Sequence, residues 1–130
     1  MGHKPKSVKL RLLKGHFRGY QYDFPYQDLG ERTGLTQGKL KEAVFQIAPA
    51  TSQWFVDLFA GSGQMGLEAW SRDYSPVLLC ELEGQKVQFL HQQVRRLQQR
   101  VARQNAMSHS IFIKKINSLE LLKRSALIPD

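Results

Sequence analysis

The sequence predicts an α/β fold: a parallel, doubly wound sheet flanked by helices and preceded by a β-hairpin. The first observation is the stretch 54–70, in which an apolar run, Trp54 to Phe59, leads into a glycine-rich turn and a helix. The second is that two further apolar runs, at 76–81 and 110–114, alternate with helical patterns. Apolar strands that alternate with helices are typical of parallel sheets covered on both faces.

The first part of the chain, residues 1–50, predicts a basic β-hairpin followed by one helix. Basic and aromatic residues mix over two short strands, 8–13 and 17–24, around a turn at Gly15. Thr36 is placed to cap a helix over 37–47. We treat this part as a unit distinct from residues 51–130, which hold the N-terminal half of the sheet domain.

The second part, residues 51–130, predicts three strands and three helices. Trp54 to Leu58 is its first strand, and the helices cover 65–71, 84–103 and 118–124, the last of them capped by Ser118. The long helix carries an apolar stripe at helical spacing, which we expect to face the sheet: Val87, Leu90, Val94, Leu97 and Val101.

The glycine-rich turn after the first sheet strand indicates a nucleotide-type ligand. Gly61 and Gly63 permit positive φ, and backbone N–H groups converge there with the dipole of a helix N-terminus. The spacing also fits a dinucleotide fingerprint, with Glu81 as its acidic residue. Asp57 argues against a dinucleotide, because a carboxylate beside the turn would repel a pyrophosphate. It suits the positively charged S-adenosylmethionine, whose ribose hydroxyls would bind Glu81. The plain alternative is a βαβ unit whose glycines serve only the turn.

The chain is basic, with 19 Lys and Arg residues against 11 Asp and Glu and a formal net charge of +8. The excess lies in two segments, one before Asp23 and one from Lys86 to Arg103. Two basic regions favour a polyanion such as nucleic acid over the alternative of a solvated basic surface. The aromatic residues of the hairpin would add base stacking to phosphate contacts, or else pack on the main domain.

The sequence disfavours several other kinds of site. Cys80 is the only cysteine and lies in an apolar run, which indicates a core thiol and excludes an intrachain disulfide. The four histidines show no metal-ligand spacing. No apolar run reaches the roughly 18 residues of a membrane span, and the N-terminus lacks a secretory signal. We therefore expect no metal, no membrane association and a cytoplasmic location.

Residues 57–72 closely resemble the first motif of the RsmD-like family, bacterial methyltransferases that act on a guanine N2 of small-subunit (16S) ribosomal RNA. They read Asp-Leu-Phe-Ala-Gly-Ser-Gly-x-x-Gly-Leu-Glu-Ala-x-Ser-Arg, and residues 11–19 and 39–45 resemble the family's opening hairpin and first helix. The resemblance implies a Rossmann-like S-adenosylmethionine-dependent methyltransferase fold. It also implies a cofactor site made of Asp57, Phe59, Gly61, Ser62, Gly63, Glu81 and Asn117. Asn117 would lie at the adenine end, although its residue type suits a simple turn equally well.

Two parts of the family pattern are absent from this sequence. The Arg-Pro-Thr-x-Asp-type segment before the first helix reads Gly-Leu-Thr-Gln-Gly over 34–38. The Asp-Pro-Pro-Tyr-type or Asn-Pro-Pro-Tyr-type motif, which would hold the target amino group and stack on the flipped base, has no counterpart. We therefore name no catalytic residue and expect an incomplete sheet. Without a fourth strand, the first sheet strand would have an open apolar edge, so we expect the chain to be marginally stable, to self-associate or to pair with something else along that edge.

These observations support three hypotheses about function. The first is an S-adenosylmethionine-dependent RNA methyltransferase of the RsmD-like kind, truncated or degenerate, whose partner is small-subunit ribosomal RNA or an assembling ribosomal subunit. The second is a methyltransferase-like module that binds RNA or a protein without catalysis. The third, a nicotinamide-dependent oxidoreductase, rests on the glycine spacing alone, and Asp57 argues against it.

Overall fold

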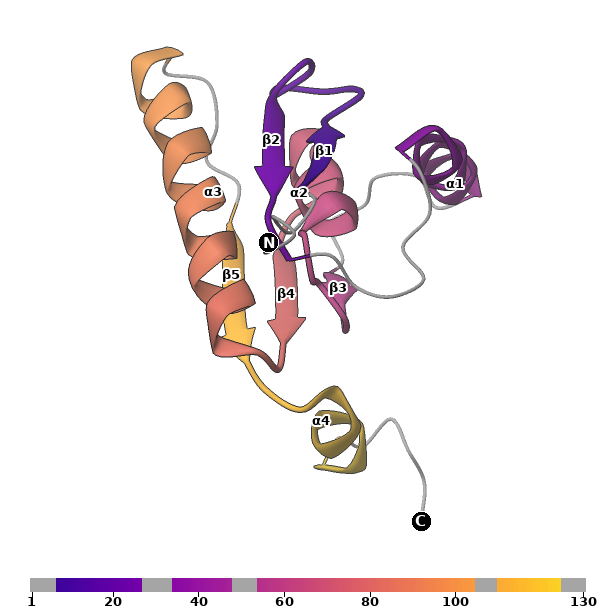
Figure 1. Cartoon of the computed structure of the whole chain (residues 1–130), viewed down its shortest axis with the longest axis vertical. Helices are drawn as coiled ribbons and strands as arrows, with labels where there is room; N and C mark the ends of the chain where they lie inside the picture. The colour runs from indigo at the N-terminus through magenta and orange to yellow at the C-terminus, as the bar shows by residue number, and fades with distance from the viewer. Residues whose placement is uncertain (1–6, 27–33, 48–53, 105–109, 125–130) are drawn as a thin grey trace, which may run out of the picture.

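The computed structural model describes residues 7–26, 34–47, 54–104 and 110–124. Strands and helices alternate after an opening hairpin, as Figure 1 shows. The elements in chain order are β1 (Val8–Arg11), β2 (Gln21–Phe24), α1 (Gly34–Ile47), β3 (Phe55–Asp57), α2 (Gln64–Ser71), β4 (Val77–Glu81), α3 (Gly84–Gln104), β5 (Ile111–Lys115) and α4 (Ser118–Arg124).

Strands β3, β4 and β5 form a parallel sheet in that order, which confirms the predicted α/β architecture. The register aligns Val56 with Leu78 and Leu78 with Phe112. Trp54 and Leu58, expected within the first sheet strand, lie just outside β3. Within the described residues β3 has a neighbour on one side only, and this is the open edge that the sequence predicts.

Helices α2 and α3 cover one face of the sheet, as expected when parallel strands are joined by crossovers of one hand. Gly66 of α2 packs so closely on β4 that a Cβ there would lie 1.9 Å from Leu79 Cδ2. The apolar stripe of α3 is largely buried and faces the sheet as predicted. On the opposite face, Val56 is 44% exposed and Phe112 is 47% exposed. The expectation that the first sheet strand is covered on both faces is therefore wrong for the described part of the chain.

The hairpin β1–β2 lies beside α2 and α3 (Figure 1). Its aromatic side chains belong to the buried core. The ring centroids of Phe17 and Trp70 are 4.9 Å apart, and those of Phe24 and Phe89 are 5.2 Å apart. Both strands are shorter than predicted, because the connection between them folds into turns that dock on α2. At Gly15, where φ is +91°, a Cβ would lie 1.9 Å from the carbonyl oxygen of Ser71.

Two of the predicted helix caps are wrong. Helix α1 begins at Gly34, so Thr36 lies inside it. Helix α4 is capped by Asn117, whose Oδ1 accepts the N–H of Leu119 at 2.9 Å. The hydroxyl of Ser118 instead donates to the carbonyl oxygen of Leu58. The proposed division at residue 50 lies outside the described residues and stays a prediction.

No helix in the described residues has both the length and the apolar character needed to cross a membrane.

Candidate cofactor site

The candidate cofactor residues lie around the carboxyl ends of the three parallel strands. Asp57 ends β3, Glu81 ends β4, and Asn117 comes shortly after β5. Because these strands are adjacent and parallel, their carboxyl ends lie together at one end of the sheet, which we call the carboxyl edge. The hydrogen bond from the Ser118 hydroxyl to the Leu58 carbonyl draws the start of α4 toward the end of β3. This edge is where ligands bind in open α/β sheets.

The carboxylate of Asp57 connects β3 to the glycine-rich turn and to α2. Its Oδ1 accepts the N–H of Phe59 at 3.2 Å, and the carboxylate also accepts the N–H of Gly66 in the first turn of α2. The N-cap residue of α2, Gly63, has no side chain to cap the helix, so Asp57 performs this role from the strand. Burial raises the pKa of Asp57, the two backbone hydrogen bonds lower it, and the Glu81 carboxylate raises it. A carboxylate accepts about four hydrogen bonds, so capping leaves acceptor capacity for the amino group of a ligand.

Glu81 holds the glycine-rich turn from the neighbouring strand. Its Oε1 accepts the N–H of Gly61 at 2.9 Å, and its Oε2 accepts the N–H of Glu83 at 2.8 Å. Gly61 and Gly63 have φ of +50° and +80°, which confirms the predicted use of glycine at this turn. A Cβ at Gly61 would meet nothing closer than the carbonyl oxygen of Phe59 at 4.0 Å. The outer side of the turn therefore has open space against which a ligand can lie.

Phe59, Ser62 and Asn117 differ in what they offer a ligand. The Phe59 side chain is 74% exposed beside the turn, whereas Ser62 is buried and contributes to the turn through its backbone. Asn117 is half-buried, and its Oδ1 is engaged in capping α4. This capping bond supports the turn-forming interpretation of Asn117, while its side-chain N–H₂ group remains at the carboxyl edge.

Sequence patterns do not predict a buried charge cluster on α2, which we call the Glu68 cluster: Glu68, Lys41 and Arg72. Glu68 of α2 is fully buried, and its carboxylate accepts the backbone N–H groups of Leu13 at 2.9 Å and Lys14 at 3.2 Å. It also lies 3.3 Å from Lys41 Nζ and 3.0 Å from Arg72 Nε. Only the pair with Arg72 has a sequence signal, the i,i+4 spacing on one helix. The cluster fastens the hairpin and α1 onto the helix that follows the glycine-rich turn.

Two buried polar atoms near the start of α2 have no hydrogen-bond partner among the described residues. They are the Tyr22 hydroxyl and the Gln64 Oε1. Burial raises the pKa of Tyr22, with smaller contributions from Tyr20, Glu68 and Asp57. Gln64, the first residue of α2, also lines a cavity of about 220 Å³ between β1, α1 and α2. Buried hydrogen-bond acceptors normally have a donor. A ligand that donates a hydrogen bond in this cavity would therefore give the Gln64 Oε1 the partner it lacks.

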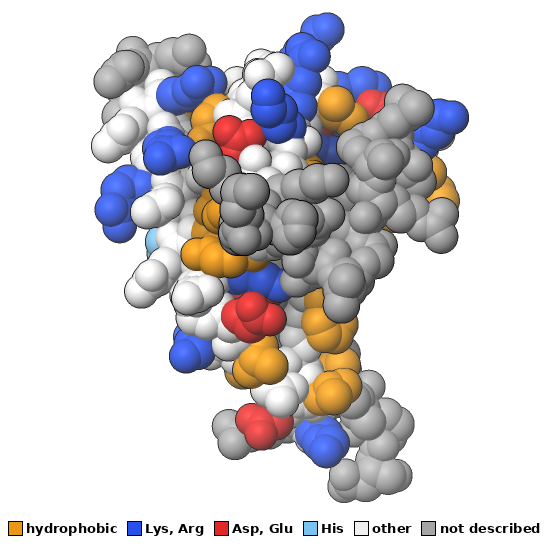
Figure 2. All heavy atoms as spheres, in the orientation of Figure 1, with side chains coloured by type: hydrophobic (Ala, Val, Ile, Leu, Met, Phe, Trp, Pro, Cys, Tyr) orange, Lys and Arg blue, Asp and Glu red, His pale blue; other side chains and the backbone are white. Residues whose placement is uncertain are grey.

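The basic residues of the hairpin and of α3 form one exposed surface, which Figure 2 shows as Lys and Arg side chains gathered over these elements. Arg100 lies over the ring of Tyr20, with its guanidinium carbon 4.8 Å from the ring centroid. The inclusion of Lys86 in this surface is wrong, and of the two alternatives for the hairpin aromatics the structure shows packing on the main domain. Lys86 is buried beside Phe24, and the hairpin aromatics Phe17, Tyr20 and Tyr22 lie in the core, so they are not available to stack on bases. We call the remaining exposed cations the basic face: Lys9, Arg11, Lys14, Arg18, Arg95, Arg96 and Arg100.

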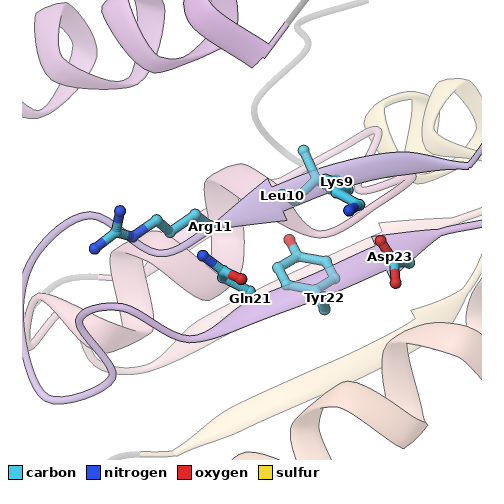
Figure 3. Close-up of a pocket in the computed structure, with 6 residues that line it drawn as sticks. All are labelled: Lys9, Leu10, Arg11, Gln21, Tyr22 and Asp23. Carbon is cyan, nitrogen blue, oxygen red and sulfur yellow. The ribbon is translucent and has the colours of Figure 1, made fainter.

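A polar hollow of about 330 Å³ lies on the hairpin within this basic face. Figure 3 shows Arg11 and Gln21 at one end of it and Lys9 and Asp23 at the other, with Tyr22 between them. The cations at both ends can contact phosphate oxygens, and the amide of Gln21 adds a neutral donor.

Comparisons with known proteins agree with the fold described above. The profile of a family described as conserved hypothetical protein 95 matches residues 10–122. The fold is similar to that of a solved structure described as the putative methyltransferase yhhF from Escherichia coli, with a TM-score of 0.67 and 25% identity. That match covers 88% of this chain and 56% of the Escherichia coli chain. A structure described as a putative methylase from Haemophilus influenzae gives a TM-score of 0.62 at 24% identity, covering 89% of this chain and 56% of that one. No curated protein sequence is significantly similar to the chain.

The family match spans most of the sequence and includes the hairpin, the glycine-rich turn and all three strands of the parallel sheet. The two matched structures, which are described as a methyltransferase and a methylase, share the fold of this chain. The chain spans 56% of the length of each. The chain therefore belongs to the family described as conserved hypothetical protein 95, which is the RsmD-like family that residues 57–72 resemble.

Proposed function

We propose that this chain carries the S-adenosylmethionine-binding part of an RNA methyltransferase that acts on a guanine N2 of small-subunit ribosomal RNA. The observation that carries the proposal is the pairing of Glu81 with the N–H of Gly61 beside Asp57. It fixes two carboxylates at the carboxyl edge of the sheet, next to an open glycine-rich turn. This arrangement suits a ligand that has a positive charge at one end and ribose hydroxyls at the other.

S-adenosylmethionine supplies the methyl group when it is bound, and the residues of the chain supply its position. Asp57 would hold the amino group of the methionine end, directly or through water. Gln64, whose buried Oε1 lacks a partner within the described residues, offers a second acceptor near this end of the ligand. Glu81 would accept hydrogen bonds from the ribose hydroxyls, since each of its oxygens uses one lone pair on a backbone N–H. Phe59 and Asn117 flank the same edge.

The basic face supports the RNA part of the proposal. Its cations lie on β1, on the turns of the hairpin and on α3, and they combine two regions that are distant in the sequence. Positive side chains spread over one exposed surface match the phosphate backbone of a folded RNA or an assembling ribosomal subunit. Because the hairpin aromatics are buried, this contact would depend on charge and on hydrogen bonds, not on stacking.

Calorimetric titration of the chain with S-adenosylmethionine and S-adenosylhomocysteine tests the cofactor site. We expect saturable binding that weakens at least tenfold in Asp57→Ala and in Glu81→Ala, which corresponds to the loss of one charge-assisted contact. Asp23→Ala, which removes an exposed carboxylate from the hairpin, is the matched control and should leave binding unchanged. A parallel titration with NAD tests the oxidoreductase hypothesis, since the residues around the turn do not favour a pyrophosphate.

A second candidate function is a non-catalytic module that binds RNA or a protein. It is favoured by the altered segment 34–38, which reads Gly-Leu-Thr-Gln-Gly. If a folded sample binds RNA but neither form of the cofactor, this second candidate replaces the first. Methyl transfer to a small-subunit RNA fragment in the presence of cofactor would exclude it.

A further inference from the structure

Four exposed polar side chains surround the hollow on the hairpin: Lys9 and Arg11 from β1, and Gln21 and Asp23 from β2. They share one face of the hairpin because successive residues of a strand point to opposite sides, and the residues between them are buried. The strand β1 therefore contributes two cations to the hollow, whereas β2 contributes a carboxylate and an amide (Figure 3). The two sides of the hollow differ in the chemical groups that they can bind.

These four side chains do not satisfy one another. The register places Lys9 opposite Asp23 and Arg11 opposite Gln21. Neither pair forms a hydrogen bond or an ion pair, and none of the four side chains has such a partner among the described residues. The donors and acceptors around the hollow are therefore all available to a ligand.

The dimensions of the hollow suit one nucleotide of a single strand. Its volume is about 330 Å³, at the lower end of the range of about 300–1,000 Å³ that small-ligand sites have. Lys9 and Arg11 are two residues apart on one strand, which separates them by about 7 Å. This spacing is comparable with that of consecutive phosphates along a nucleic-acid strand, so both cations can contact one RNA backbone. A base attached to this backbone would then lie over the side chains of β2.

The side chains of β2 favour guanine among the four bases of RNA. A carboxylate offers two acceptor oxygens and no donor. Guanine is the base whose Watson–Crick edge has two adjacent donors, N1–H and N2–H₂, so it can donate to both oxygens of Asp23 at once. The neighbouring O6 of guanine is an acceptor, and the amide of Gln21 can donate to it. Adenine, cytosine and uracil each have an acceptor beside their donor, and this acceptor would face a carboxylate oxygen unfavourably.

We propose that Asp23 recognises an unpaired guanine in the RNA substrate, while Gln21 donates to the O6 of that base and the two cations of β1 contact its flanking phosphates. The inference rests on the proposed function, since it takes RNA as the ligand of the basic face. The residues around the hollow belong to the hairpin, whereas Asp57 and Glu81 lie at the carboxyl edge. Asp23 is therefore a specificity contact outside the cofactor site. The guanine that it binds is a second base, in addition to the one that would receive the methyl group.

The test measures the affinity of the full chain of 130 residues for short, fluorescently labelled RNAs by anisotropy, in the absence of cofactor. Each RNA is an oligouridine with one central base, which is guanine, adenine, cytosine, uracil or hypoxanthine. We expect guanine to raise the affinity about tenfold over the other three natural bases, as for one bidentate contact. Hypoxanthine, which is guanine without the N2 amino group, should give an intermediate affinity.

Asp23→Asn should reduce the preference for guanine to less than about twofold, because the amide keeps one acceptor and turns a donor toward the second guanine donor. Its affinity for oligouridine should not fall, since the substitution removes a negative charge from the basic face. The preference for guanine and the overall affinity therefore change in opposite directions. A carboxylate that acted only through its charge would alter the affinity for every RNA by the same factor.

The matched control is Glu120→Gln, which removes the same charge from an exposed position on α4 and should keep the preference for guanine. Lys9→Ala should weaken the binding of every RNA by a similar factor and also keep the preference. Circular dichroism should show that all three variants remain folded.

The inference is overturned if the native chain binds every RNA equally, if the preference for guanine persists in Asp23→Asn, or if none of the RNAs binds. Equal binding of every RNA would leave the proposed function standing, because charge alone would then hold the RNA. Absence of RNA binding would also remove the RNA part of the proposed function. The calorimetric titration with cofactor tests the remaining part independently.

Discussion

The carboxylate of Glu68 on α2 lies 3.3 Å from the ammonium group of Lys41 on α1, and both side chains are buried. Lys41 Nζ also donates to the carbonyl oxygen of Arg11 on β1 at 2.9 Å. A single ion pair therefore connects the helix after the glycine-rich turn with the first helix and with the hairpin. Burial lowers the pKa of Lys41 and the Glu68 carboxylate raises it, so the charge of Lys41 depends on Glu68.

Glu68→Gln should lower the free energy of unfolding by about 3 kcal/mol, because it leaves the buried Lys41 without its opposite charge. The amide group of the new side chain would also face one of the backbone N–H groups of Leu13 and Lys14, and would lose that hydrogen bond. Urea unfolding followed by circular dichroism measures the effect. Glu42→Gln is the control: Glu42 lies 3.6 Å from Lys14 and Arg72 and is partly exposed, so its loss should cost under about 1 kcal/mol.

Asp57→Asn should separate stability from cofactor binding. Burial raises the pKa of Asp57 above its ordinary value of 3.8, so between these two pKa values the folded chain binds more protons than the unfolded chain. The contribution of Asp57 to stability is therefore present at low pH and falls as the pH rises through this window. Asparagine carries no charge and keeps one acceptor oxygen for the Phe59 N–H, but its amide group would face the Gly66 N–H that the carboxylate accepts.

We therefore expect the removal of the buried charge to offset most of the lost Gly66 hydrogen bond at pH 7, so that Asp57→Asn stays within about 1 kcal/mol of the native chain. Its stability relative to the native chain should fall as the pH is lowered toward 3.8. Its affinity for S-adenosylmethionine should nevertheless fall at least tenfold. Unfolding curves over this pH range and a calorimetric titration at pH 7 measure the two effects. A variant that is less stable at pH 7, yet binds cofactor normally, would show that Asp57 acts only as the cap of α2.

Alanine substitutions at two helix glycines should change the stability of the fold in opposite directions. At Gly66 of α2 a Cβ would lie 1.9 Å from the Leu79 side chain, so Gly66→Ala should destabilise the fold by about 1–3 kcal/mol through overpacking. At Gly38 of α1 a Cβ would meet nothing within 4 Å, and Gly38→Ala should stabilise the fold by about 0.5–1 kcal/mol through helix propensity. Thermal and urea unfolding of the pair provide the measurement. Equal effects of the two substitutions would contradict the close packing of α2 on β4.

The affinity of the basic face for RNA should fall as the salt concentration rises, and the steepness of this fall should report how many phosphate contacts are made. Arg11→Ala on the hairpin and Arg96→Ala on α3 should each weaken binding of a small-subunit RNA fragment. Each should also reduce the slope of log affinity against log salt by about 0.7–1, as expected for the loss of one phosphate contact. Filter binding or fluorescence anisotropy at several salt concentrations measures this slope. Lys123→Ala, on the exposed surface of α4, is the control and should change neither quantity.

The sequence by itself determined the parts of this protein that depend on local periodicity and on glycine. The apolar runs and helical stripes predicted the order of strands and helices, because the repeat of a helix or strand is fixed by backbone geometry. The spacing of Gly61 and Gly63 predicted the positive φ values that the structure has. The family resemblance over residues 57–72 predicted the fold that the comparisons confirm.

The tertiary structure decided which partner each polar side chain has. Lys86 has the same residue type as the cations of the basic face but is buried beside Phe24, and the hairpin aromatics face the core. Glu68 meets Leu13, Lys14 and Lys41 from distant segments, and no local pattern encodes such contacts. Asp57 caps α2 from a neighbouring strand, and Val56 is exposed because α2 and α3 both pack on the other face of the sheet. These features depend on contacts between residues far apart in the chain, which the periodicity of a single segment does not specify.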